Sequence, residues 1–236
     1  TWPSDPTGIM VGYYGDNSLS NIRVTNNIVT QVTSQTFIVN YNAPHGIVVN
    51  GVVTGLEIDH NTIHDIAAVV NTSGYGGSTG IALYGYDTTP LSTNVNIHDN
   101  VVNDIRVTNT GTGDAVPRGI RVGWGAGAAT IAANQIHDLA GVGIQTSASA
   151  NAAVSITGNT IQNVVTGVSM GHAAGGSITG NTISASGTGI LLGSAVGSAP
   201  TITGNDVLSP AVQFRDDAHK VTMSTVFASN TWAPYS

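Results

Sequence analysis

The stretch SITGNTIQNVVTGVSM at residues 155–170 returns in altered form as SITGNTISASGTGILL at residues 177–192. Both copies contain an apolar residue, two further residues, an asparagine, one residue and a second apolar residue. This six-residue pattern occurs eight times along the chain, and its asparagines are Asn27, Asn61, Asn100, Asn134, Asn159, Asn181, Asn205 and Asn230. Eight matches at one phase indicate an internal repeat, and an internal repeat determines the fold class.

A second element, a glycine followed by apolar residues in alternation, lies between the asparagines. It begins at Gly8, Gly46, Gly80, Gly119, Gly143, Gly167 and Gly189, and a degenerate copy begins at Ala211. Period-two alternation predicts short strands with one buried face. The later repeats of 22 to 25 residues fit three short strands and three turns, which make one coil of a β-solenoid. We therefore predict an all-β solenoid of about eight coils.

The repeated asparagines explain one of the turns. Asparagine tolerates a left-handed backbone and hydrogen-bonds locally through its amide. If successive coils stack in phase, these amides form a ladder along the solenoid axis. The same stacking places complementary side chains next to each other: Arg23 with Glu57, Asp59 with His98, and His60 with Asp99.

Composition narrows the class of protein. Only 8% of the 236 residues are charged, and the net charge is −7 with a single lysine, Lys220. Nucleic acid is excluded as a partner because binding phosphates requires clustered cations. The chain has no cysteine, so neither disulfides nor thiolate metal sites hold the fold. No apolar run approaches the ~20 residues of a membrane span. We expect one β-helix domain over residues 1–236, from a processed chain or a fragment of a longer one.

The turn asparagine and the Gly-Ile strand together resemble the right-handed parallel β-helix superfamily, over about residues 8 to 232. Pectate and alginate lyases, mannuronan C5-epimerases, polygalacturonases and phage tailspikes share this fold. The resemblance implies an extracellular or cell-surface protein that binds or processes a polysaccharide. It specifies the fold and not one activity, because many chemistries use this scaffold.

Variation in coil length indicates where a binding face would lie. From the ladder asparagine to the next Gly-apolar strand the chain takes 19 residues in three successive coils, and nine or fewer afterwards. The extra residues form predicted insertion loops at about 33–45, 67–79 and 106–118. Insertions on one side of a solenoid often form its binding face. We therefore expect these loops to stack into a shelf beside the Gly-apolar strand.

Polar and aromatic residues border this shelf. The candidate catalytic residues are His45, Tyr84, Arg118 and Arg121, and the candidate substrate-binding residues are Asn50, Tyr86, Asp87, Asp114 and Trp124. Elimination or epimerisation of a uronate needs a cation on the carboxylate, a base and an acid. One of the two arginines would be the cation, the histidine the base and Tyr84 the acid. A hydrolase would instead use two carboxylates, for which Asp87 and Asp114 are the candidates.

A second constellation contains Asp65, Asp104 and Asp138, which occupy equivalent positions next to Asn163. Stacking would place the three carboxylates ~4.8 Å apart in a row, where they repel unless a cation such as Ca²⁺ binds them. Alternatively, each aspartate caps the following turn by accepting backbone N–H groups. The adjacent histidines leave a transition metal as a third interpretation. No cofactor is required by the repeat itself.

The two ends of the solenoid differ. Residues 215–225 and a final coil with Trp232 look like a finished end, whereas the N-terminal TWPSDPTG is too short for a capping helix. Because bare strand edges recruit other chains, we expect further coils, self-association or a covering partner at the N-terminal end. A rival function is a structural module, such as an adhesin stalk, a filament or a tail-fibre segment. Low charge and regular later coils favour this rival, and the clustered insertions, arginines and aromatics favour polysaccharide.

Overall fold

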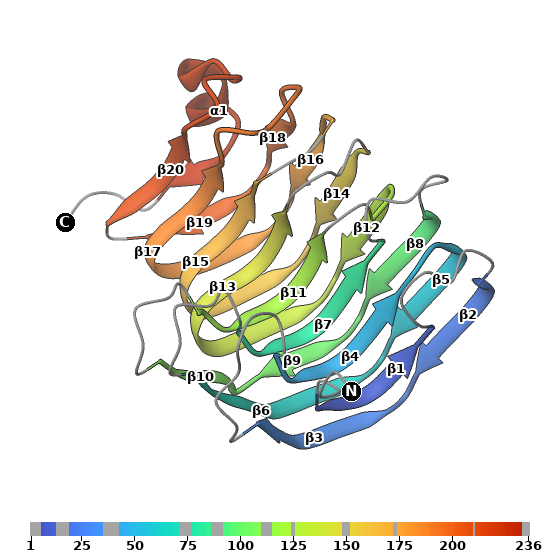
Figure 1. The fold of residues 1–236 in the computed structure, drawn as a ribbon. Coiled ribbons are helices and arrows are strands. Elements are labelled where there is room, and N and C mark those ends of the chain that lie inside the picture. The colour runs from blue at the N-terminus through green and yellow to red at the C-terminus, as the bar shows by residue number, and fades with distance from the viewer. Residues whose placement is uncertain are drawn as a thin grey trace.

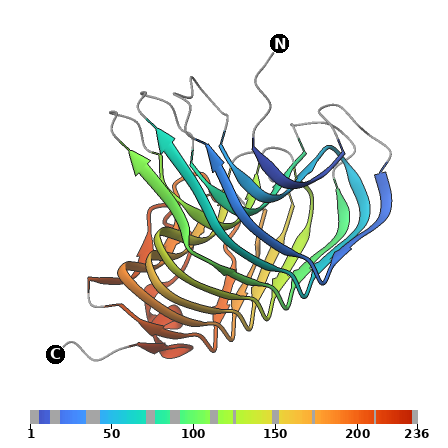
Figure 2. The same cartoon turned by 90° about the horizontal axis from the view of Figure 1, so that it is seen from below.

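The structure is a computed structural model, described here for residues 6–12, 19–34, 43–70, 77–85, 92–109, 115–123, 126–147, 152–171, 174–209 and 211–232. Its strands pair in parallel and stack into a right-handed parallel β-helix, as the repeat predicts. Figures 1 and 2 show the coils following one another from the blue strands at one end to the red strands at the other.

Two parallel sheets form the walls. Within the described residues one sheet has seven strands: β2 (Leu19–Thr25), β5 (Val53–Asp59), β8 (Thr93–His98), β12 (Ala129–Ala132), β14 (Val154–Thr157), β16 (Gly176–Thr179) and β18 (Thr201–Thr203). The other, likewise counted over the described part, has fourteen: β1 (Thr7–Val11), β3 (Ile28–Ser34), β4 (His45–Asn50), β6 (Thr62–Val70), β7 (Thr79–Tyr84), β9 (Val101–Asn103), β10 (Ile105–Asn109), β11 (Arg118–Gly123), β13 (Gln135–Ser147), β15 (Thr160–Met170), β17 (Thr182–Leu192), β19 (Asp206–Leu208), β20 (Val212–Asp216) and β21 (Thr231–Trp232).

The later coils depart from the prediction of three separate strands. In β13, β15 and β17 the second and third strands of a coil run on without a break. The bend within β13 falls at Asp138, with φ of 57°, and the bend within β15 at Asn163, with φ of 52°. A single left-handed residue turns the chain there without interrupting the ladder of backbone hydrogen bonds.

The asparagine ladder is confirmed. Each ladder asparagine donates from Nδ2 to Oδ1 of the next, at 2.7–3.0 Å from Asn27 through to Asn230. The same Oδ1 also accepts the backbone N–H of the preceding asparagine, as in Asn61 N to Asn100 Oδ1 at 3.0 Å. The six inner members are 1% exposed, so these bonds satisfy amides that have no access to water.

The left-handed backbone lies one residue before seven of the eight ladder asparagines, rather than on the asparagine itself, whereas Ser229, before Asn230, has φ of −100°. His60, Asp99 and Ala133 have φ between 52° and 54°, and Asn26 has φ of 57°. In the later coils glycine takes this place, at Gly158, Gly180 and Gly204. The tight turn therefore depends on the residue before the amide, which leaves the asparagine side chain free to point along the axis.

Stacked β-branched side chains fill the interior. One row, in strand register, contains Ile58, Ile97, Ile131, Ile156, Ile178 and Ile202, all at most 4% exposed. Helix α1 (Met223–Ala228) contributes the buried Val226 to the same core at the C-terminal end. At the N-terminal end Ile9, Val11 and Leu19 are only partly buried. The covering partner for that end stays a prediction.

Candidate functional site

The outward surface of β4, β7 and β11 brings the four candidate catalytic residues together. In strand register His45 lies beside Thr79 and Thr79 beside Arg118. Three residues further along each strand, Val48 lies beside Ala82 and Ala82 beside Arg121. We call this surface, with Tyr84 and with Gln145 of the neighbouring β13, the Arg–His face.

The glycine of the repeat lets β4 pack closely against β6 and β7 of the same sheet. A Cβ on Gly46 would lie 2.4 Å from Cγ2 of Ile63 and 2.6 Å from the carbonyl oxygen of Gly80, so no other residue fits. Beyond it, Ile47 joins the interior core, whereas Val48 packs outside with Ala82 and Tyr84. The residues of the Arg–His face are thus held on a rigid strand by a glycine that packs inside.

Direct contacts connect the members of the face. The rings of His45 and Tyr84 meet edge-on with centroids 5.8 Å apart. The guanidinium carbon of Arg121 lies 5.5 Å from the centre of the Tyr84 ring, and its Nη1 is 3.5 Å from the phenol oxygen. Arg118 donates from Nε to Oε1 of Gln145, and from Nη1 to the carbonyl oxygen of Val116 at 2.9 Å.

The face is buried and positively charged. His45 is 4% exposed and Arg118 is 7% exposed. Burial lowers the pKa of Arg118 to about 10, with a further contribution from Arg121. Burial, followed by Arg121 and Arg118, lowers the pKa of His45 to about 3, so the imidazole is neutral at pH 7. Both pKa values fall because a positive charge is disfavoured in a poorly solvated site and beside another positive charge.

Two buried polar atoms of the face have no hydrogen-bond partner among the described residues. Within the described residues, His45 Nδ1 and Thr79 Oγ1 are buried and accept or donate no hydrogen bond. The two acceptors of Arg118 are neutral oxygens, and no carboxylate of the described residues lies within ion-pair distance of it. Buried polar groups are normally satisfied, and an unpaired buried cation is costly. The arrangement can accept an anion.

The remaining predicted binding residues divide into two groups. Asn50 lies beside Tyr84 in strand register and is partly exposed. Tyr86, Asp87, Asp114 and Trp124 lie outside the described residues. The hydrolase pair and the sugar-stacking tryptophan therefore stay predictions.

The insertions begin as strands. β3 continues to Ser34, β6 to Val70 and β10 to Asn109, and these three extensions pair in parallel. A small cluster that includes Ala68, Val70 and Ala115 supports them outside the main core. The predicted loop segments within 35–42, 71–76 and 110–114 lie outside the described residues.

Sequence reasoning missed Thr79 and Gln145, although the repeat contained the signal for both. Thr79 precedes Gly80 as His45 precedes Gly46, and Gln145 occupies in GIQT the place that Arg121 occupies in GIRV. The register of β11 with β13 places Gln145 next to Arg121.

The row of aspartates has side-chain partners. Nη2 of Arg106 lies 3.1 Å from Oδ1 of both Asp65 and Asp104. Asp138 accepts from Nδ2 of Asn163 at 2.8 Å and lies 2.8 Å from Nδ1 of His137. Among the described residues these bonds go to side chains rather than to backbone N–H groups, so the predicted turn capping is wrong. The left-handed φ of each aspartate forms the bend instead.

Arg106 occupies the position between two carboxylates that a Ca²⁺ ion would need. Millimolar CaCl₂ is therefore expected to leave the melting temperature of the native protein unchanged. It should raise that of Arg106→Ala, in which Asp65 and Asp104 face each other without a cation. Calorimetric melting of both proteins checks this, with MgCl₂ as the ionic-strength control. An equal rise in both proteins would mean that calcium binds beside the guanidinium.

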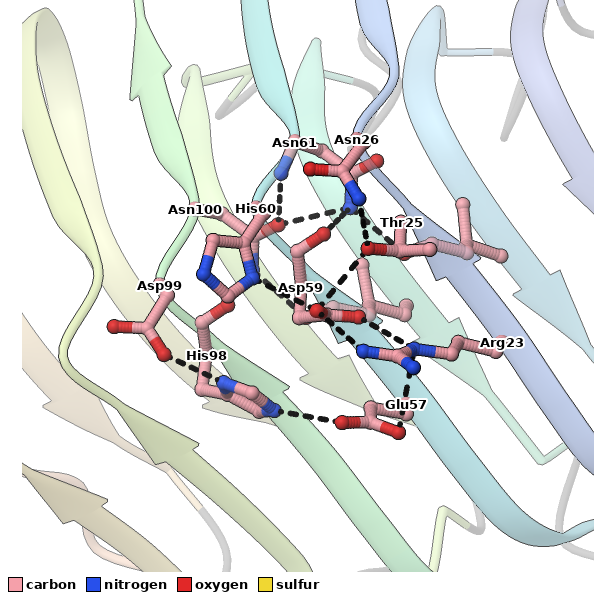
Figure 3. A network of polar contacts seen from close by, with 12 residues as sticks. Arg23, Thr25, Asn26, Glu57, Asp59, His60, Asn61, His98, Asp99 and Asn100 are labelled. Carbon is pink, nitrogen blue, oxygen red and sulfur yellow. Dashed lines mark hydrogen bonds and ion pairs between the residues drawn. The ribbon is translucent and has the colours of Figure 1, made fainter.

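A polar network lies on the outer surface of β2, β5 and β8 and is shown in Figure 3. The predicted register is confirmed, because Arg23 lies beside Glu57 and Asp59 beside His98. Asp59 is 1% exposed and accepts from Nη2 of Arg23 at 3.0 Å and from Oγ1 of Thr25 at 3.1 Å. These bonds satisfy a carboxylate that burial alone would neutralise.

Stability should depend on Asp59 at acid pH. The hydrogen bond from Arg23, with those from His60 and Thr25, lowers the pKa of Asp59 from its usual 3.8 to about 2. The stabilisation is therefore complete above about pH 4 and is lost as the pH falls towards 2. We expect about 1–2 kcal/mol, since Arg23 is solvent-exposed. Chemical unfolding measured from pH 5 to pH 2 should show a smaller loss of unfolding free energy in Asp59→Asn than in the native protein. Equal losses in the two proteins would contradict this role of Asp59.

One protein family matches the chain in sequence. The sequence pattern of the NosD family, described as periplasmic copper-binding protein, matches residues 30–234. No curated protein and no solved structure matches the chain. Within the described residues, no helix is long and apolar enough to span a lipid bilayer.

Proposed function

The chain belongs to the NosD family of β-helix proteins, and we propose that its Arg–His face binds an anionic polysaccharide through uronate carboxylates. The family description places its members in the periplasm, which lies outside the cytoplasm. Cell-envelope polysaccharide is encountered in that compartment. The finer assignment, to the cell surface or the extracellular space, is part of the same proposal.

The observation that carries the proposal is the buried guanidinium of Arg118. It is 7% exposed, its pKa is lowered by burial and then by the charge of Arg121, and among the described residues it bonds only to neutral oxygens. A carboxylate of a ligand would supply the missing negative charge. Arginine suits this role because its planar fork binds a carboxylate through two parallel hydrogen bonds.

Neighbouring residues favour a sugar over a simple carboxylic acid. Tyr84, which is 8% exposed, contacts the ring of His45 and the guanidinium of Arg121, and aromatic surface packs well on pyranose rings. Along the axis the row of Arg121 continues in register through Gln145 to Ser169. An extended polymer lying along this row would meet a polar side chain at each ~4.8 Å step of the solenoid.

Lyase or epimerase chemistry at the same face would use the same residues. A carboxylate held by Arg118 or Arg121 acidifies the adjacent carbon–hydrogen bond, because the cation stabilises the developing negative charge. His45 is neutral, and its Nδ1 is buried without a partner among the described residues. In its neutral form this ring would take the proton, and Tyr84 would protonate the departing oxygen. This chemistry requires that the polysaccharide bind, but the polysaccharide could bind without being processed.

Copper is the ligand in the family description, and the described donor set does not fit it. No group of three or more His, Asp or Glu residues converges within the described residues, and the chain has no cysteine. Met170 is buried in the core, while Met10 and Met223 are exposed. Soft copper sites use Cys, Met or grouped His ligands. The described residues therefore do not make a copper site, and copper has no part in the function proposed for this chain.

Isothermal titration with hexagalacturonate and with a guluronate hexamer tests the proposal, with cellohexaose as the neutral control. We expect at least one uronate oligomer to bind, no binding of cellohexaose, and at least about tenfold weaker uronate binding to Arg121→Ala. Appearance of unsaturated product, followed by ultraviolet absorbance, reports lyase activity in the same samples. Unchanged binding in Arg121→Ala would remove this face from the proposal. Failure of every oligomer to bind would favour the rival, a structural module.

A further inference from the structure

We infer that the Arg–His face takes up one proton, on His45, when it binds its anion, so that binding strengthens as the pH falls. This inference rests on the proposed function, because it concerns the same site and the same carboxylate ligand. It adds a regulatory property: the occupancy of the face would follow the acidity of its surroundings.

The surroundings of His45 are the first reason. Strand β7 presents Thr79 and Tyr84 to it, and β11 presents Arg118 and Arg121. On its other side β1 places Thr7 in register with it. The charged groups that face the imidazole from these elements are thus two cations and a phenol. None of the described residues on them is a carboxylate.

The unpartnered ring nitrogen is the second reason. His45 Nδ1 is buried and has no hydrogen-bond partner among the described residues. In the absence of ligand, a proton added to the imidazole would place a third positive charge in a poorly solvated site. The new N–H group would also lack an acceptor among the described residues. Burial, Arg121 and Arg118 accordingly hold the pKa of His45 at about 3. The face without ligand contains a neutral imidazole.

A bound carboxylate reverses each of these conditions. Its charge offsets that of the two arginines, and a carboxylate has about four lone-pair positions, enough to accept from a guanidinium and from an imidazolium together. Opposite charge within about 4–6 Å favours the protonated ring, so the pKa of His45 rises in the complex. Because the proton and the anion each stabilise the other on the protein, their binding is reciprocally coupled.

The sign and size of the effect follow from this linkage. Affinity for the anion should increase as the pH falls below the pKa of His45 in the complex, and for one proton the increase is at most about tenfold per pH unit. Between pH 7 and pH 5 we expect the association constant for hexagalacturonate to rise at least about threefold. Uronate carboxylates remain ionised over this range, since carboxyl groups titrate near pH 4.

Calorimetric titration of the native protein with hexagalacturonate at pH 5, 6 and 7, at constant ionic strength, tests the inference. Each pH is measured in two buffers of different ionisation enthalpy, because the difference in heat gives the number of protons taken up. At pH 5 we expect the protein to take up roughly 0.3 to 1 proton for each carboxylate that binds at the face, and at pH 7 a smaller number. His45→Gln should bind without uptake and with an affinity that does not vary with pH. His137→Gln, altered on another surface, should behave as the native protein does.

The outcomes separate this inference from the proposed function. Binding of hexagalacturonate with no proton uptake at any pH overturns the coupling and leaves the anion site intact. Uptake that persists in His45→Gln assigns the proton to another group and also overturns the inference. Absence of binding at every pH, in a protein whose circular dichroism shows a folded β-structure, overturns the proposed function itself. A melting curve for each variant confirms that it is folded at the temperature of titration.

Discussion

Replacing Asn100 with alanine is expected to destabilise the protein by about 3–5 kcal/mol. Oδ1 of Asn100 accepts both the backbone N–H and the Nδ2 of Asn61, each at 3.0 Å. Its own Nδ2 donates to Oδ1 of Asn134 at 2.9 Å and to the carbonyl oxygen of Ile58 at 2.9 Å. Alanine would leave several of these buried groups without a partner, at about 1–3 kcal/mol each.

Asn27 provides the matched control for the ladder. It stands at the N-terminal end of the row, is only part-buried, and its loss leaves no earlier asparagine unsatisfied. We expect Asn27→Ala to cost about 1 kcal/mol. Denaturant midpoints and melting temperatures of the two variants give the comparison. Equal, small losses in both would mean that the ladder does not hold neighbouring coils together.

Replacing Arg118 with methionine is expected to abolish uronate binding, by about a hundredfold or more, while stability stays the same or rises. The guanidinium is buried beside Arg121 without a carboxylate among the described residues. Exchanging a buried charge for an apolar side chain of similar volume is often neutral or stabilising. A ligand that depended on that charge would lose about 2–5 kcal/mol of binding free energy. Loss of binding without loss of stability is the result expected for a residue that serves binding rather than folding.

Arg23 is the matched control for Arg118. It is an arginine of the same solenoid, but its guanidinium pairs with Asp59 and Glu57 on the sheet of β2, β5 and β8. Arg23→Met should lower the melting temperature, because it leaves the buried Asp59 without its main partner, and should leave uronate binding unchanged. Calorimetric titration and melting of both variants show whether each arginine serves binding or stability. A destabilised Arg118→Met that still binds hexagalacturonate would make Arg118 a structural residue.

The fold and its register followed from the sequence because each coil repeats the same constraints. The ladder asparagines and the neighbour pair Arg23 and Glu57 were predicted from spacing alone, and the structure confirms both. In a solenoid, residues matched in the repeat are neighbours in space, so a one-dimensional pattern gives three-dimensional contacts. The gathering of His45 and Arg118 on one face followed by the same reasoning.

Other features depended on side-chain directions that spacing does not give. The repeat placed Asp65 and Asp104 in one row but did not show that Arg106, two residues beyond Asp104, reaches both carboxylates. It also did not show that the left-handed turn residue precedes the amide, because histidine and alanine occur at that position as well as glycine, asparagine and aspartate. Burial of the Arg–His face likewise could not be read from the alternation, which marks the strand's outer side as polar.

The most direct measurement of the central claim is a crystal structure of the protein with hexagalacturonate, grown near pH 5. We predict a uronate carboxylate within hydrogen-bond distance of Arg118 or Arg121, a pyranose ring against Tyr84, and His45 Nδ1 facing a carboxylate oxygen. A hexamer bound on another surface, with the guanidinium of Arg118 still bonded only to Val116 and Gln145, would contradict the account.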